Sequence, residues 1–172
     1  WSSPRVVAHD PSVHLCEPGI VVSPDGNRIA MLLRENSRTK RSHICFSDDK
    51  GVSWSTPVEM DASLFGDRHQ AVYDDEGRLF ISFRDTDKMS ETAGDWVAWV
   101  GTFEQLELGY PGHYRIRLSD NKHSWDCAYP GVQCLPDGTI FTATYGHWDG
   151  GEKPYIRGVH INLAEIEQMW EE

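Results

Sequence analysis

The sequence predicts an all-β fold made of short antiparallel strands joined by tight turns. Turn-forming pairs stand between two apolar runs at three places, Asp25-Gly26, Glu76-Gly77 and Asp137-Gly138. Glycine accepts the positive φ of such a turn, so an Asp-Gly pair in this setting is a strong hairpin signal. Helical composition is scarce, and the 172 residues fit one domain.

The hairpins repeat along the chain. Residues 17–34, 69–84 and 129–145 each read as strand, turn and strand when they are aligned on the turn glycines, which are 51 and 61 residues apart (77 − 26 and 138 − 77). A repeat of roughly 40–50 residues built of short strands is typical of a β-propeller with about four strands per blade. We therefore expect a single partial β-propeller domain of about three four-stranded blades, with approximate bounds 1–60, 61–125 and 126–172.

Two stretches depart from this pattern. Residues 163–171 have a helical composition at the end of the sequence, and residues 61–65 are consistent with one short turn. We expect strands and loops elsewhere.

The segment Ser47-Asp-Asp-Lys-Gly-Val-Ser-Trp54 matches the Asp-box, S-x-D-x-G-x-x-W, at all four fixed positions. Its roles are local. Asp49 can accept hydrogen bonds from the backbone of its own turn, Gly51 permits a left-handed residue, and Trp54 packs the hairpin onto its blade. We expect Ser47, Asp49, Gly51 and Trp54 to be structural.

Charge and composition exclude several functions. The chain has 16 Lys and Arg against 27 Asp and Glu, a formal net charge of −11, which argues against a nucleic acid or an anionic membrane as partner. No apolar run approaches the roughly 18–20 residues of a membrane span. The eight histidines form no HExxH motif or close metal pair, so no metal or cofactor is expected. The four cysteines leave two alternatives, buried free thiols or two disulfides.

Several positions together resemble the sialidase (neuraminidase) superfamily of Asp-box, or BNR-repeat, propellers. Glu17 begins one predicted strand, Arg34 ends the next, and the Asp-box follows them. Asp126-Cys-Ala-Tyr129 precedes an Asp-Gly turn, as the nucleophilic tyrosine does in that family. The resemblance covers nearly the whole chain and matches the C-terminal half of the family's propeller. It implies a six-bladed, sialidase-type ring and an exo-acting, retaining glycoside hydrolase for terminal sialic acid or a related acidic sugar.

The resemblance also implies roles for individual residues. Tyr129 is the expected nucleophile and Glu17 its general base. Arg34 is an expected ligand of the sugar carboxylate, which an arginine fork binds bidentately. A further arginine is expected to be Arg84, which ends a strand as Arg34 does, in preference to Arg68.

Three more residues are expected to line the pocket. His69 and His147 lie near the ends of predicted inner strands, and Trp96 offers an aromatic face to a sugar, although core packing is the alternative for this tryptophan. No residue matches the family's general-acid aspartate or its first arginine. We therefore expect a fragment of a secreted or periplasmic enzyme that lacks the N-terminal blades, with carbohydrate as its ligand.

Two alternatives remain open. One is a non-catalytic glycan-binding or scaffold propeller that keeps the Asp-box without the chemistry. The other is a half-propeller that closes its ring as a homodimer. The hydrolase hypothesis predicts that Glu17, Arg34, Arg84 and Tyr129 converge at one end of the propeller axis, whereas the scaffold hypothesis predicts scattered, solvent-paired arginines.

Overall fold

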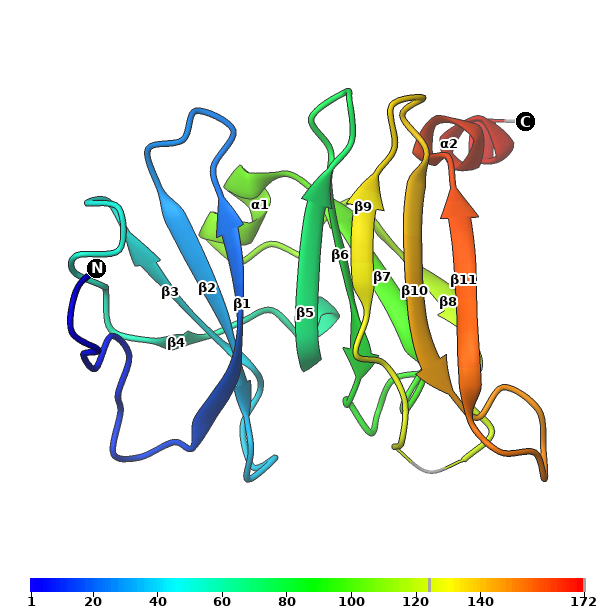
Figure 1. The fold of residues 1–172 in the computed structure, drawn as a ribbon, viewed down its shortest axis with the longest axis horizontal. Coiled ribbons are helices and arrows are strands. Elements are labelled where there is room, and N and C mark those ends of the chain that lie inside the picture. Colours follow the sequence, from blue (N-terminus) through cyan, green and yellow to red (C-terminus); the bar gives the residue numbers. More distant parts are fainter. Residues whose placement is uncertain (124, 172) are drawn as a thin grey trace.

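The structure, a computed structural model, describes residues 1–123 and 125–171. Three antiparallel sheets stand side by side along the molecule, in the manner of propeller blades (Figure 1). The all-β prediction and the β-propeller fold are confirmed. The strands of the first sheet, in order, are β1 (Leu15–Val22), β2 (Ile29–Glu35), β3 (His43–Ser47) and β4 (Val58–Glu59). Those of the second are β5 (Gly66–Tyr73), β6 (Leu79–Asp85), β7 (Trp96–Gly101) and β8 (Tyr114–Ser119).

The third sheet has three strands, one fewer than predicted. They are β9 (Gly131–Cys134), β10 (Ile140–Gly146) and β11 (Tyr155–Ile161), with β10 in the centre. After β11 the chain turns into the helix α2 (Leu163–Glu171) instead of forming a fourth strand. Asn162 begins this helix, since its side-chain oxygen accepts the backbone N–H groups of Ala164 and Glu165.

The three predicted hairpins form the inner half of the sheets. Gly26, Gly77 and Gly138 all have φ between 74° and 83°, as tight turns require. They connect β1 to β2, β5 to β6 and β9 to β10, and each pair is antiparallel.

Two helical segments of the structure match the prediction from the sequence, and one was not predicted. Helix α2 has the predicted bounds, and a 3-10 turn at Ala62–Leu64 falls inside the predicted short turn. Helix α1 (Phe103–Leu108) was not predicted. Thr102 and Gln105 form a reciprocal capping box, and Gly109 ends the helix in the left-handed region.

Two apolar layers join the sheets. Leu32, Ile44, Ile81 and Trp99 belong to the layer between the first and second sheets. Phe80, Val100, Ile140 and Ile161 belong to the layer between the second and third. The first strands of neighbouring sheets touch, β1 with β5 and β5 with β9, so these three are the inner strands.

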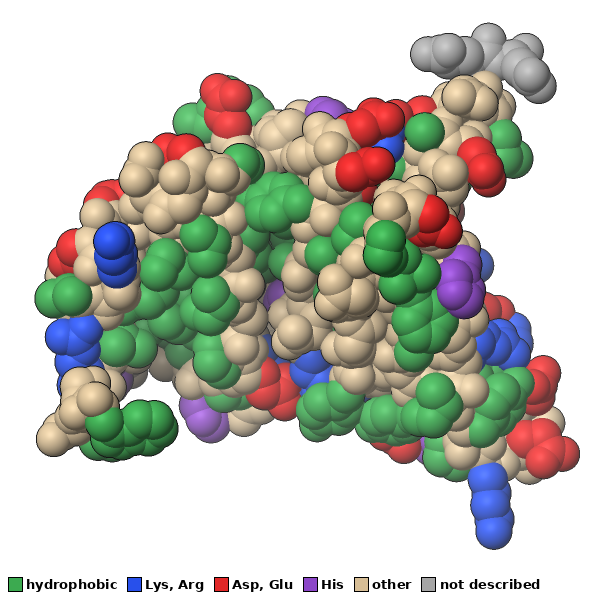
Figure 2. All heavy atoms as spheres, turned by 45° about the horizontal axis from the view of Figure 1, so that its top comes forward, with side chains coloured by type: hydrophobic (Ala, Val, Ile, Leu, Met, Phe, Trp, Pro, Cys, Tyr) green, Lys and Arg blue, Asp and Glu red, His purple; other side chains and the backbone are tan. Residues whose placement is uncertain are grey.

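The sheets at the two ends each keep apolar side chains in solvent. Ile20 and Val22 of β1 are exposed, as are Tyr155 and Ile156 of β11. In Figure 2 hydrophobic side chains form patches on the left part and on the middle and lower right of the face, with charged side chains around its edge.

The four cysteines are free thiols, but the first alternative, buried free thiols, holds for only two of them, because Cys16 and Cys134 are half-buried. Cys45 and Cys127 are buried. Within the part of the chain that the structure describes, no helix is long and apolar enough to cross a bilayer.

Candidate functional site

The inner strands share an unusual backbone feature at their starts. β1 and β5 each contain a bulge, between Cys16 and Gly19 and between Asp67 and Gln70. At both bulges a residue other than glycine adopts the left-handed region, Glu17 with φ of 47° and Arg68 with φ of 63°. This conformation costs about 1–2 kcal/mol for an L-residue and persists only where the surroundings enforce it.

The third sheet repeats the feature just before β9. Ala128 has φ of 58°, and its backbone N–H donates to the carbonyl of Tyr145 on β10. The inner strands begin at the same edge of the molecule, the lower edge in Figure 1, so the two bulges and the left-handed Ala128 lie at one end of the sheets. Strained residues of this kind are enriched at binding and catalytic sites, which makes this end the candidate functional site.

Asp67 is the centre of the site. Its side chain is only 2% exposed and is surrounded by guanidinium groups. Arg38 Nη2 lies 2.7 Å from Oδ2, Arg34 Nε lies 3.4 Å from Oδ1, and Arg84 Nη2 also binds Oδ2. Burial raises the pKa of Asp67, but the hydrogen bonds from Arg84 and Arg38 outweigh it, so the pKa lies below its ordinary value.

Glu17 links this centre to the second bulge. Arg34 Nη1 donates to Glu17 Oε1 at 2.9 Å, and Arg68 Nε lies 3.5 Å from Oε2. Burial lowers the pKa of Arg34, but Asp67 and Glu17 raise it by more, so the pKa of Arg34 lies above its ordinary value. We call Glu17, Arg34, Arg38, Asp67, Arg68 and Arg84 the arginine cluster.

Tyr129 joins the arginine cluster through Arg68. The guanidinium carbon of Arg68 lies 3.4 Å from the centroid of the Tyr129 ring, a cation–π contact. The backbone N–H of Tyr129 donates to Thr144 Oγ1 at 2.8 Å, and its ring stacks on Tyr145 with centroids 5.9 Å apart. Tyr129 is 56% exposed, so its phenol is accessible to a ligand.

The arginine cluster carries an excess of positive charge. Four arginines share the two carboxylates of Glu17 and Asp67, a local balance of +2 in a chain whose net charge is −11. Among residues 1–123 and 125–171, the Nε atoms of Arg34, Arg68 and Arg84 are buried without a hydrogen-bond acceptor, and Glu17 Oε2 is buried without a donor. Such groups are rare in folded proteins. In the cluster three buried donors without a partner stand against one such acceptor, an excess of donors that is expected of an anion-binding site.

Arg84 lies beneath the accessible part of the cluster. Its side chain is 5% exposed, and its Nη atoms bind Asp67 and the carbonyls of Trp125 and Cys127. Arg34, Arg38 and Arg68 are more exposed. The geometry therefore places Arg68 beside Glu17 and Tyr129, with Arg84 supporting the loop that leads into β9.

His147 belongs to a second polar group beside Tyr129. Its Nε2 lies 3.2 Å from Asp126 Oδ2, and the Tyr145 hydroxyl donates to Asp126 Oδ1 at 2.8 Å. The hydrogen bond from Tyr145 is the largest of several contacts that lower the pKa of Asp126. His123 stacks on His147 with ring centroids 4.4 Å apart.

Two expected pocket residues are instead buried in the packing. Trp96 is fully buried, donates from its indole N–H to Ser82 Oγ at 2.8 Å, and packs on Trp148. Its expected role as an exposed sugar platform is corrected by this burial. His69 is 2% exposed and stacks on Phe83, and burial lowers its pKa to about 4. His69 is thus a core residue behind the site and is not part of the pocket lining.

The Asp-box begins at Ser47, the last residue of β3, and continues into the loop that leads to β4. Asp49 accepts hydrogen bonds from Ser53 and from the Ser47 hydroxyl, and the Trp54 indole N–H donates to the Gly51 carbonyl. These contacts are internal to the loop. The motif therefore stabilises a turn and says little about activity.

Sequence reasoning did not single out Asp67 or Arg38. In the sequence Asp67 looks like any other acidic residue near the start of a strand. Arg38 lies in a basic loop, whose charged side chains would be expected to form exposed ion pairs. One signal was present. Glu17 and Arg68 stand the same number of residues before the glycines of their turns. Aligning the repeats on these glycines therefore matches Arg68 with Glu17, and Asp67 with Cys16, at the start of an inner strand.

Comparison with known proteins supports the fold. No protein-family model matches the sequence, and no curated protein matches it significantly. Among solved structures, a protein of unknown function from Dyadobacter fermentans is similar over 90% of this chain and 40% of its own, with TM-score 0.72 and 19% identity. A xylan β-1,4-xylosidase from Bacillus halodurans is similar over 87% of this chain and 28% of its own, with TM-score 0.56 and 11% identity.

A thermostable family-43 glycoside hydrolase is similar over 92% of this chain and 51% of its own, with TM-score 0.57 and 13% identity. Across these neighbours the chain spans about a quarter to a half of their length. Identities this low show a shared propeller fold and nothing finer.

The comparisons correct the family resemblance drawn from the sequence. The solved structures described above are a family-43 glycoside hydrolase, a xylosidase and a protein of unknown function, and none of them is a sialidase propeller. The assignment to the sialidase superfamily is wrong, and the six-bladed, sialidase-type ring has no support. The physical reason lies in the motifs. An Asp-box is a turn device that many antiparallel hairpins can adopt, so it reports on hairpins rather than on a family.

Proposed function

We propose that this chain is part of a glycoside-hydrolase-like propeller whose arginine cluster binds the carboxylate of an acidic sugar. The observation that carries the proposal is the convergence of Glu17, Arg34, Arg68 and Tyr129 at one end of the inner strands, within an arginine cluster whose charge is +2. The likeness to a xylosidase and to family-43 glycoside hydrolases supports carbohydrate as the ligand class.

Guanidinium groups account for the preference for an acid. Arginine presents a planar fork that matches a carboxylate, and hydrogen bonds between charged partners are roughly twice as strong as neutral ones. Asp67 holds Arg34 and Arg38 in place, and Glu17 holds Arg34 and Arg68. A ligand carboxylate at the mouth then meets guanidinium groups that are already oriented, which lowers the entropic cost of binding.

Two groups of the site are suited to proton transfer. The Glu17 carboxylate can accept a proton, and the exposed Tyr129 hydroxyl can lose one as its oxygen attacks the anomeric carbon. In this proposal the Tyr129 proton passes to Glu17 as the bond between the tyrosine oxygen and the anomeric carbon forms. The bond from the anomeric carbon to the leaving group breaks in the same step, and the departing oxygen takes a proton from water. A second water then attacks the anomeric carbon and gives its proton to solvent, while Glu17 returns its proton to the tyrosine oxygen as the sugar leaves. Asp67 and the arginines position the substrate and take no part in the bond changes.

The binding claim is tested with methyl glucuronoside and methyl glucoside, which differ in the carboxylate. We expect measurable affinity for the uronoside only, and Arg68→Met to weaken it by about tenfold or more, since a hydrogen bond between charged groups contributes about 1.5–3 kcal/mol. Arg117→Met is the matched control, because Arg117 lies on β8 and pairs with Asp95. Equal affinity for both sugars would refute the proposal.

The hydrolytic claim is tested separately. With aryl uronosides as substrates, Tyr129→Phe and Glu17→Gln should abolish turnover while uronoside binding survives within a few fold. Binding without turnover in the unsubstituted protein would contradict the hydrolase assignment and identify a glycan-binding propeller instead.

A further inference from the structure

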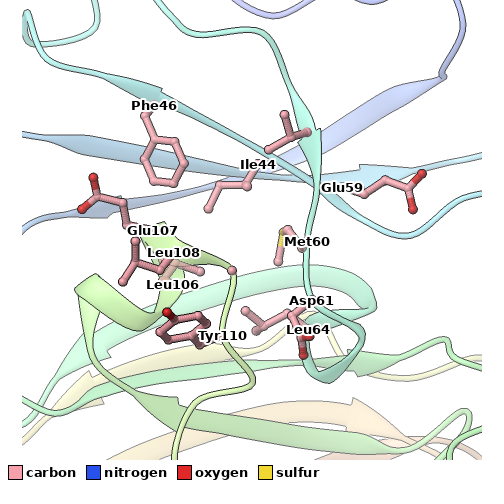
Figure 3. A pocket seen from close by; sticks show the side chains of 12 residues that line it. Ile44, Phe46, Glu59, Met60, Asp61, Leu64, Leu106, Glu107, Leu108 and Tyr110 are labelled. Atoms are coloured by element: carbon pink, nitrogen blue, oxygen red, sulfur yellow. The ribbon is translucent and has the colours of Figure 1, made fainter.

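A separate pocket lies between the first and second sheets, and none of its lining residues belongs to the arginine cluster (Figure 3). Strands β3 and β4 and the 3-10 turn form one wall, and α1 with the residues after it forms the other. The cavity measures about 190 Å³. Its apolar lining includes Phe46, Met60, Leu64, Leu106, Leu108 and Tyr110.

The walls of this pocket are fixed by the fold. Met60, Leu64 and Leu106 are at most 3% exposed and are anchored in the layer between the two sheets. The capping box holds the start of α1, and Gly109, with φ of 70°, turns the chain so that Tyr110 comes back beside the helix. A preformed cavity needs little reorganisation to receive a ligand.

The rim of the pocket is acidic. Among the described residues that line it are Glu59, Asp61 and Glu107, and none is a lysine or arginine. Glu107 already pairs with Arg28, and Arg41 Nε lies 3.9 Å from Glu59. That leaves Asp61 as the carboxylate for a ligand.

Asp61 is positioned by its own turn. Its Oδ1 accepts the backbone N–H of Ser63 at 2.8 Å, which caps the 3-10 turn. No basic side chain pairs with it within residues 1–123 and 125–171. Figure 3 shows Asp61 next to Leu64, at the end of the pocket below Met60.

We propose that this pocket binds a small amine that carries one apolar ring. The ring lies among Phe46, Met60 and Leu106, and the ammonium group pairs with Asp61. An apolar cavity of about 150 Å³ is large enough to bind benzene, so a cavity of this size accepts one ring. The acidic rim selects a cation over a neutral or anionic group of the same shape.

The test uses methyl NMR of the full chain with ¹³C-labelled methionine methyl groups. Met60 lines the pocket, whereas Met31, Met89 and Met169 do not and serve as internal controls. The probes are 2-phenylethylamine, its neutral analogue 2-phenylethanol, and butylamine, which lacks the ring. We expect the Met60 signal alone to shift with phenylethylamine, with Kd on the order of 1 mM. The alcohol should bind about three- to fivefold more weakly, the range of one partly exposed ion pair.

Two variants separate the ring from the charge. Asp61→Asn keeps a capping oxygen, so the turn survives, and should make the amine and the alcohol bind equally. Leu108→Trp fills the cavity from an exposed position and should abolish the Met60 shift for both ligands. Glu91→Gln removes one exposed carboxylate outside the pocket and should change nothing.

Several results would overturn the proposal. They are no shift of Met60 with phenylethylamine up to about twenty times the expected Kd, equal shifts at all four methionines, or equal affinity for the amine and the alcohol. Binding of butylamine as tight as that of phenylethylamine would also overturn it, because the ring would then contribute nothing.

Discussion

At the scale of single residues, Asp67 holds the site together. It is the buried anion around which Arg34, Arg38 and Arg84 are arranged. A buried charge is tolerated only while it is paired, so the three arginines and Asp67 depend on one another. Arg84 is deeply buried, whereas Arg38 is more exposed. We therefore expect the loss of Arg84 to lower the stability of the fold more than the loss of Arg38.

Arg84→Met is expected to destabilise the fold more than it affects the ligand preference. It removes a partner of a buried carboxylate and the donor to two loop carbonyls, and breaking such a pair costs about 3–5 kcal/mol. Urea unfolding measures this cost. Lys122→Met, at a pair in which both side chains are exposed, should change the unfolding free energy by about 0.5 kcal/mol or less. A cost for Arg84→Met below about 1 kcal/mol would contradict the supporting role assigned to Arg84.

The site was predictable from the sequence only in part. Glu17, Arg34 and Tyr129 stand at strand ends beside recognisable turns, and the structure brings them together. Asp67 was missed because it lies at a bulge, where Arg68 adopts the left-handed region. The alternation of apolar and polar residues along a strand does not reveal a bulge. Trp96 was misjudged because an aromatic residue in a central strand looks the same in sequence whether its face is open or covered.

At the scale of elements, the loop after β2 is held by one carboxylate. Glu35 is 3% exposed and accepts hydrogen bonds from the Ser37 hydroxyl and from the backbone N–H groups of His14 and Thr39. Burial raises the pKa of Glu35, but these hydrogen bonds outweigh it and lower the pKa to about 2. This loop also carries Arg38 into the arginine cluster, so Glu35 links loop stability to the site.

Glu35→Gln should therefore lower stability in a pH-dependent way. The folded pKa lies below the ordinary 4.5, so the stabilisation is fully present above about pH 4.5 and is lost as the pH falls towards 2. At pH 7 we expect the variant to unfold with about 2 kcal/mol less free energy, a deficit that shrinks below pH 4.5. Urea titrations at several pH values, with Glu91→Gln as control, measure it. A deficit independent of pH would exclude this account.

Elements with strong local signals were predicted, and those with weak ones were not. The three hairpins follow from their turn glycines, and α2 follows from a run of helix-forming residues. Helix α1 has six residues, too few for a helical period to stand out against neighbouring strands. Its signal was the pair Thr102 and Gln105 followed by Gly109, which is a capping pattern rather than a periodicity.

At the scale of the whole molecule, the sheets at the two ends each leave one face without a neighbouring sheet. A propeller blade buries both faces against its neighbours, and exposed apolar sheet faces promote association. Ile20 and Val22 at one end and Ile156 at the other are exposed. The similar solved structures are longer than this chain. The periodicity of the sequence indicates individual blades, but it does not fix how many blades complete a ring.

We predict that the isolated chain self-associates through these end faces. Light scattering should give a mass above 19.6 kDa that rises with concentration. Ile20→Lys and Ile156→Lys together should restore the monomer mass, whereas Lys at the exposed Met89, in a loop of the second sheet, should not. A monomer at every concentration would contradict this expectation.

The central claim is that the arginine cluster recognises the carboxylate of a sugar. The most direct test is a calorimetric titration of the unsubstituted chain with glucuronate and with glucose at low and high salt. The account predicts binding of glucuronate alone, weakening as salt screens the guanidinium groups. Equal binding of glucose, or no binding of glucuronate at low salt, would contradict it.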